Sequence, residues 1–162
     1  MIDPQRTIFL HGLEGSSQGV KATLLRQLFP GLLTPDFNGP LQERMATLNA
    51  IIGKESGWTI IGSSFGGLMG AIFTCQHPRQ VKKLILLAAA LPWPDFANQP
   101  PDPVSVPVLM FHGSRDQIVP LEPARRLAEQ IFPNLTFQVV DDDHGLYKTV
   151  HSLNWQELLT SP

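Results

Sequence analysis

The sequence has 162 residues, of which 43% are hydrophobic and 16% charged, so a disordered chain is excluded. Its formal net charge of -2 gives no electrostatic basis for binding nucleic acid or an anionic membrane surface. A single cysteine excludes an internal disulfide, and neither a signal-peptide pattern nor a long apolar run is present. We therefore expect one cytoplasmic domain over residues 1–162, with no membrane or nucleic-acid partner.

Short apolar runs alternate with amphipathic stretches along the whole chain. The runs expected to form buried strands are Thr7–His11, Leu32–Thr34, Trp58–Ile61, Val81–Ala89, Val106–His112 and Leu135–Val140. Apolar residues at helical spacing predict helices between them, the last from about Tyr147 to Leu159. Val20, Leu28 and Ile51 are among the residues expected to face inward. The alternation predicts an α/β fold whose doubly wound parallel sheet has about six strands and helices on both faces.

The third strand leads directly into a G-x-S-x-G element formed by Gly62, Ser63, Ser64, Phe65 and Gly66. A serine between a strand and a helix, with glycines two residues before and after it, is typical of a nucleophile elbow. Such a turn strains the serine backbone and leaves no room for a Cβ at either glycine. We therefore predict that Ser64 is a nucleophile, rather than part of a simple Gly/Ser-rich turn.

A serine hydroxyl is a weak nucleophile at neutral pH and needs a base that is itself held by an anion. His144 follows the last strand, and Asp116 follows the fifth, so both belong to the carboxyl edge of the predicted sheet. The order Ser64, Asp116, His144 is the one expected for this kind of elbow. His11 and His112 also end strands and are expected to line the site or brace its loops.

Two backbone N–H groups are needed to bind the oxyanion of an acyl-transfer reaction. We expect them from Phe65, directly after the nucleophile, and from Leu13 in the loop after the first strand. The alternatives for this loop are a simple turn or a phosphate nest, although the P-loop spacing and its lysine are absent. Glu14, in the same loop, faces either the mouth of the site or solvent.

Two further stretches admit more than one interpretation. The acidic run Asp141–Asp143 precedes His144 and is the alternative source of the acid, although it is too close in sequence to His144 to reach behind the ring, so Asp116 is preferred. One of its carboxylates is expected to hydrogen-bond the backbone of the histidine loop. Contiguous aspartates alone do not converge on an ion, so no metal site is predicted. The Pro-rich segment Leu91–Ser105 is too short and broken for a lid domain. Its residues Leu91, Trp93 and Phe96 form either an apolar substrate wall or loop packing against the sheet.

Together these blocks resemble the α/β-hydrolase fold, and more narrowly the small, lidless YqiA-type esterases of bacteria. The similar segments are Phe9–Ser17, Gly62–Gly67, His112–Pro120 and Asp141–Leu146, and the match runs from about residue 6 to residue 159. The resemblance implies Ser64 as nucleophile, Asp116 as acid, His144 as base, and Leu13 and Phe65 as oxyanion donors. It also implies a strand order of 2-1-3-4-5-6 without a lid.

From these features we expect a serine hydrolase that cleaves small carboxylic esters or thioesters through an acyl-enzyme. It would need no metal and no organic cofactor, and its partner would be a small-molecule acyl substrate. Two alternatives stay open: a non-catalytic binding module that kept the scaffold, and an acyltransferase that uses an acceptor other than water.

Overall fold

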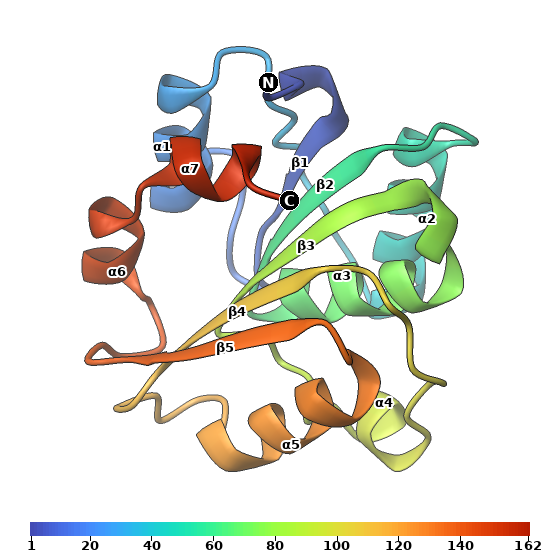
Figure 1. Cartoon of the computed structure of the whole chain (residues 1–162), viewed down its shortest axis with the longest axis vertical. Helices are drawn as coiled ribbons and strands as arrows, with labels where there is room; N and C mark the ends of the chain where they lie inside the picture. Colours follow the sequence, from blue (N-terminus) through green and yellow to red (C-terminus); the bar gives the residue numbers. More distant parts are fainter.

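The computed structural model describes residues 1–162 and contains one sheet of five parallel strands (Figure 1). The strands are β1 (Thr7–Leu10), β2 (Trp58–Ser63), β3 (Val81–Leu87), β4 (Val108–Gly113) and β5 (Leu135–Val140), in the spatial order β1-β2-β3-β4-β5. All residues of β1, β2 and β4 are buried, as expected for strands covered on both faces. The edge strand β5 contains only exposed and partly buried residues.

Seven α-helices cover the two faces of this sheet. They are α1 (Val20–Leu28), α2 (Leu41–Ile52), α3 (Phe65–Gln76), α4 (Pro94–Asn98), α5 (Leu121–Ile131), α6 (Tyr147–Ser152) and α7 (Trp155–Thr160), with short 3-10 turns at Pro4–Arg6 and Pro78–Gln80. One core lies between the sheet and α1, α6 and α7, and the other between the sheet and α2, α3, α4 and α5. The predicted doubly wound architecture is therefore confirmed. None of the helices has the combination of length and apolar character that crossing a bilayer requires.

The expected strand at Leu32–Thr34 is reduced to a single bridge, which corrects the predicted count of six strands to five. Leu33 pairs with Ile8: its carbonyl accepts from the Phe9 N–H (2.9 Å) and its own N–H donates to the Thr7 carbonyl (3.0 Å). The segment thus lies beside β1, where the predicted order places it. Pro35 lacks an N–H and cannot extend the ladder, so the pairing ends there.

Other departures concern the helices. The expected last helix is two helices, because Leu153 is extended and the Asn154 side chain caps α7 by accepting from the Glu157 N–H (3.2 Å). The Leu91–Ser105 segment contains the short helix α4 and no lid. Val20, Leu28 and Ile51, predicted to face inward, are 49%, 49% and 36% exposed.

The inward face of α2 explains one of these errors. Its buried residues are Arg44, Leu48 and Ile52, four residues apart, so this stripe begins with an arginine instead of an aliphatic residue. Ile51 lies beside the stripe and is partly exposed. A prediction based only on apolar residues therefore assigns the wrong face of α2 to the core, rotated about the helix axis from the buried one.

The tightest packing in the fold joins β1 to the start of α3 at Gly66. A Cβ on Gly66 would overlap the Leu10 carbonyl oxygen, and that backbone cannot move without disturbing β1. We predict that Gly66→Ala lowers the free energy of unfolding by more than about 3 kcal/mol, measured by urea denaturation. Gly57→Ala is the control: Gly57 has a φ of 82° but no neighbour within 4 Å, so backbone strain alone should cost about 1 kcal/mol. Equal losses in the two variants would contradict the packing argument.

Candidate active site

Ser64 lies in the turn between β2 and α3 with a strained backbone, at φ 54° and ψ -115°. The turn is possible because the flanking positions are glycines: a Cβ on Gly62 would lie 2.5 Å from the Gly66 carbonyl oxygen. Non-glycine residues reach positive φ only where the surrounding structure enforces it. This is the elbow geometry that the sequence predicts, and it presents the Ser64 hydroxyl at the N-terminal end of α3.

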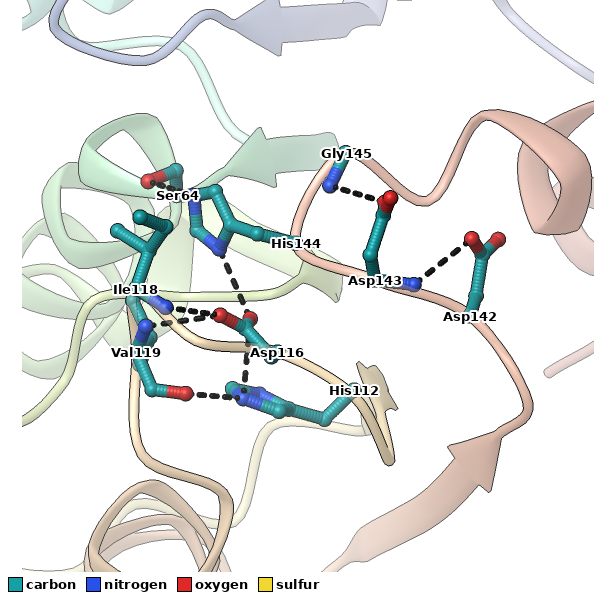
Figure 2. Close-up of polar contacts among 9 residues, drawn as sticks. All are labelled: Ser64, His112, Asp116, Ile118, Val119, Asp142, Asp143, His144 and Gly145. Carbon is teal, nitrogen blue, oxygen red and sulfur yellow. Dashed lines mark hydrogen bonds and ion pairs between the residues drawn. The ribbon is translucent and has the colours of Figure 1, made fainter.

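Ser64, His144 and Asp116 come together at the carboxyl edge of the sheet (Figure 2). The Ser64 Oγ lies 3.0 Å from the His144 Nε2, and the His144 Nδ1 lies 2.8 Å from the Asp116 Oδ2. A carboxylate can only accept, so the hydrogen on the neutral imidazole is on Nδ1. Nε2 is then free to accept the Ser64 hydroxyl proton. The structure therefore brings the three residues into one continuous hydrogen-bonded chain.

The Asp116 side chain is completely buried, and both of its oxygens accept hydrogen bonds. Its Oδ1 accepts from the backbone N–H groups of Ile118 and Val119, each at 2.8 Å. Its Oδ2 lies 3.3 Å from the Nε2 of His112 as well as next to His144. A buried carboxylate is tolerated only when it is hydrogen-bonded in this way, and the bonds fix its orientation toward His144.

His112, one of the two histidines expected to line the site or brace its loops, braces the acid loop. It is fully buried at the end of β4, and its Nε2–H donates to the Val119 carbonyl at 2.9 Å. Its Nδ1 has no partner in the protein. Two other histidines lie apart from the reacting atoms: His77 caps the C-terminus of α3, and His151 is on the exposed face of α6.

The acidic run fixes the His144 loop through two carboxylates, where the sequence predicted one. Asp142 accepts from the Thr149 N–H (2.9 Å) and the Thr149 hydroxyl (2.7 Å) at the start of α6, and also from the Asp143 N–H (2.8 Å). Asp143 accepts from the Gly145 N–H at 3.0 Å (Figure 2). Asp141 is exposed and pairs with Arg115 at 3.0 Å, without a contact to the His144 loop. No group of three or more His, Cys, Asp or Glu side chains is arranged to hold a metal ion.

The expected oxyanion donors face the same space as Ser64. Leu13, Ser64 and Phe65 together line an apolar pocket of about 240 Å³. Neither the Leu13 N–H nor the Phe65 N–H makes a hydrogen bond within the protein. Glu14, for which the sequence left two options, is exposed to solvent. The first loop and the elbow therefore present two unused donors beside the hydroxyl.

Of the three expected wall residues, only Trp93 lines this pocket. Leu91 is fully buried in the core, and Phe96 lines a separate groove beside α2 and α3, so neither belongs to the wall. Trp93 meets Phe65 edge to face, with ring centroids 5.1 Å apart. The pocket also contains residues that the sequence reasoning missed: Ala90, Pro92, Pro94, Ile118, Val119 and Pro120. Ile118 is 70% exposed, and the sequence signal that could have found it is an isoleucine two residues after the expected acid, in a loop at the carboxyl edge of the sheet.

A second, larger hollow of about 770 Å³ opens on the histidine side of Ser64. Its lining is mostly polar and includes Arg115, Gln117, His144 and Tyr147. The reacting atoms therefore lie between an apolar pocket and a polar, open hollow. A molecule bound at Ser64 would therefore have an apolar environment on one side and a polar one on the other.

The family comparison decides where the chain belongs. The model of the serine hydrolase family FSH1 matches residues 34–146, which is more than half of the sequence and includes Ser64, Asp116 and His144. The chain belongs to the FSH1 family of serine hydrolases. This FSH1-family protein is a hydrolase and a member of the α/β-hydrolase superfamily, as its sequence resemblance predicted. No curated protein sequence matches it.

Solved structures show the same fold at low sequence identity. A hydrolase of the α/β superfamily from Xanthomonas campestris superposes with a TM-score of 0.74 at 23% identity, covering 90% of this chain and 91% of that one. Est1E from Butyrivibrio proteoclasticus gives 0.73 at 19% identity over 94% and 86%. A monoacylglycerol lipase from Paleococcus ferrophilus gives 0.69 at 16% identity over 95% and 93%. These similarities establish the fold of the FSH1-family hydrolase.

The Asp142 carboxylate gives a testable pH dependence. Burial alone would raise its pKa, but the hydrogen bonds from Thr149 and Asp143 outweigh burial, so its pKa is lowered. A carboxylate with a lowered pKa stabilises the fold above its unfolded-state pKa of about 4 and loses this contribution as the pH falls through the folded-state value.

We predict that Asp142→Asn lowers the free energy of unfolding by about 1–3 kcal/mol at pH 7. The difference from the wild type should shrink as the pH falls below about 4, measured by urea denaturation at pH 7 and pH 3. Asp141→Asn is the control, because its ion pair is exposed and should contribute less than about 1 kcal/mol. A difference for Asp142→Asn that stays constant with pH would contradict this assignment.

Proposed function

We propose that the protein is a serine hydrolase that cleaves small carboxylic esters or thioesters, with Ser64 as nucleophile, His144 as general base and Asp116 as the orienting acid. The observation that carries this proposal is the continuous chain of hydrogen bonds from Asp116 through His144 to Ser64, at the mouth of an apolar pocket. A binding module would need none of these bonds. The FSH1 family match supports the same reaction class.

In the first half of the reaction, His144 Nε2 takes the proton of the Ser64 hydroxyl as Oγ attacks the acyl carbonyl carbon. The carbonyl oxygen becomes an oxyanion, and the N–H groups of Leu13 and Phe65 donate to it. The imidazolium is stabilised by the Asp116 carboxylate at 2.8 Å. The carbon–oxygen or carbon–sulfur bond to the leaving group then breaks, and the proton on Nε2 goes to the departing atom, leaving an acyl-enzyme ester on Ser64.

In the second half, water takes the place of the leaving group. His144 removes a proton from the water as its oxygen attacks the acyl carbon, and a second oxyanion forms in the same place. Collapse of this intermediate releases the carboxylic acid and returns the proton to Ser64. The His144 side chain is 24% exposed, so water has access to Nε2. No metal or organic cofactor enters either step.

The two hollows match the two halves of the substrate. His144 must protonate the leaving group, so the leaving group lies in the polar hollow that His144 lines. The acyl chain then extends into the apolar pocket beside the oxyanion donors. A dry apolar cavity of about 150 Å³ accommodates benzene, so 240 Å³ suits an acyl group of roughly six to eight carbons.

We predict that Ser64→Ala abolishes ester turnover and covalent labelling by a fluorophosphonate probe, because no other hydroxyl lies against the His144 Nε2. Activity toward an aryl hexanoate should fall by about 10⁴-fold or more. Ser63→Ala is the matched control, since its hydroxyl makes no hydrogen bond and its turnover should be unchanged. A folded Ser64→Ala protein that keeps wild-type turnover would refute the nucleophile assignment.

The same assay separates the alternative functions. A folded wild-type protein that the probe does not label would support a non-catalytic binding module. Labelling together with acyl transfer to an added alcohol or amine in preference to water would support an acyltransferase. Hydrolysis products, identified by mass spectrometry, distinguish that outcome from the proposed esterase or thioesterase.

We predict that Trp93→Ala lowers kcat/KM for an aryl hexanoate by about tenfold and leaves that for the aryl acetate within about twofold. The indole forms the pocket wall that a six-carbon chain contacts and a two-carbon chain does not reach. The ratio of kcat/KM for hexanoate to that for acetate is the measurement, since it cancels any difference in the amount of active enzyme. An unchanged ratio would place the acyl chain outside this pocket.

A further inference from the structure

Arg44 is a buried cation without a carboxylate partner. It lies on the inward face of α2 with 5% of its surface exposed, and none of the chain's ion pairs includes it. A buried charge is costly unless it is compensated, and here the compensation comes from backbone carbonyls. Its Nε–H donates to the Gly39 carbonyl at 2.8 Å, while its two terminal nitrogens approach the carbonyls of Gly12 (3.5 Å) and Leu13 (3.3 Å).

These contacts reach the peptide unit between Gly12 and Leu13. Its carbonyl oxygen belongs to Gly12 and its N–H to Leu13, and in a planar trans peptide these two groups point in opposite directions. The carbonyl accepts from Arg44, from the His11 Nδ1–H at 2.7 Å and from the Gly15 N–H at 3.1 Å. With the oxygen held on that side, the Leu13 N–H must face the other way, into the pocket that contains Ser64.

His11 also hydrogen-bonds the Gly12 carbonyl oxygen, and its own ring is held in place by a second hydrogen bond. The Phe37 N–H donates to the His11 Nε2 at 2.9 Å, so Nε2 is an acceptor and the hydrogen of the neutral ring is on Nδ1. That hydrogen is the one directed at the Gly12 carbonyl. His11 is 4% exposed, so its ring has little freedom to turn. Arg44 and His11 therefore converge on one peptide from α2 and from the loop after β1.

Arg44 also contacts the residue that supplies the second donor. Its guanidinium carbon lies 5.4 Å from the centre of the Phe65 ring, a cation–π distance. Phe65 packs in turn against Trp93 in the pocket wall. One positive side chain therefore contacts the peptide that supplies one expected oxyanion donor and the side chain of the residue that supplies the other. A cation bound to a peptide carbonyl also polarises that peptide and makes its N–H a stronger donor.

We propose that Arg44 is a positioning residue for the oxyanion hole, which fixes and polarises the Gly12–Leu13 peptide and adds positive charge on the side where the oxyanion forms. This inference rests on the proposed function, because it assigns Arg44 a role in that reaction. Arg44 does not touch the substrate. Its effect is therefore expected in the stability of the tetrahedral intermediate and not in the affinity for the ground-state ester.

The test compares Arg44→Met, Arg44→Lys and the control Arg126→Met, which removes an exposed arginine of α5 that makes no ion pair. For Arg44→Met, kcat on an aryl hexanoate should fall about 10–100-fold while KM changes less than threefold, since one oxyanion donor is worth about 10²–10³ and Arg44 acts on it indirectly. A hexyl trifluoromethyl ketone, which forms a tetrahedral adduct with Ser64, should lose affinity by the same factor as kcat/KM.

Arg44→Lys keeps the charge but not the planar fork of donors, so it should recover part of the loss. A folded Arg44→Met protein with a lower melting temperature but unchanged kcat and inhibitor affinity would show a purely structural role and overturn the inference. If Arg44→Met does not fold, Arg44→Lys decides: inhibitor affinity about fivefold weaker supports the inference, and wild-type affinity overturns it. If the wild type and Arg126→Met both lack esterase activity, the proposed function itself fails, and the inference with it.

Discussion

The buried carboxylate of Asp116 is the interaction on which the geometry of the site depends. Ionised carboxylates are stable in a protein interior only when hydrogen bonds replace the lost water. Asp116 obtains these bonds from the backbone of its own loop and from His144 of the next loop. Satisfying this one group therefore joins the loop after β4 to the loop after β5. The imidazole reaches Ser64 only because that connection holds.

Two buried charges lie on opposite sides of the reacting atoms. Asp116 is behind His144, where an imidazolium would form, and Arg44 is behind the Gly12–Leu13 peptide, where an oxyanion would form. The tetrahedral intermediate of acyl transfer carries these two charges at once. A fixed charge of opposite sign beside each of them would stabilise the intermediate without any rearrangement at the moment of reaction. The two buried charges of the core are therefore the same charges that would stabilise the intermediate of the proposed reaction.

The surroundings of Ser64 suit a particular kind of substrate because no lid covers them. The segment between β3 and β4 contains only the short helix α4, and its residues around Trp93 form one wall of a shallow apolar pocket. The opposite side is a polar hollow bounded by the His144 loop. The expected preference is for a short or medium acyl chain with a leaving group that projects into solvent. Under the proposed function, specificity of this kind would depend on a few side chains at the rim, among them Trp93 and Ile118.

The sequence by itself determined most of the fold and predicted which residues meet at the site. Glycines at 62 and 66 around Ser64 indicated a strained turn, and the β/α alternation placed that turn, Asp116 and His144 at one edge of a parallel sheet. These signals are local, because a tight turn and a strand end each depend on neighbouring residues. The same local signals located five strands within two residues of their ends, whereas Leu32–Thr34 failed because a three-residue segment ended by a proline can pair only once.

Only the tertiary structure decided how charged and aromatic side chains are used. Arg44 looks like a surface residue of an amphipathic helix, and its burial depends on carbonyls of a loop about thirty residues away. Leu91, Trp93 and Phe96 are equally apolar in sequence, yet only Trp93 faces Ser64, because the direction of each side chain depends on how the loop folds over β3 and α3. Such contacts between distant segments have no periodicity along the chain, so only the folded arrangement of the segments reveals them.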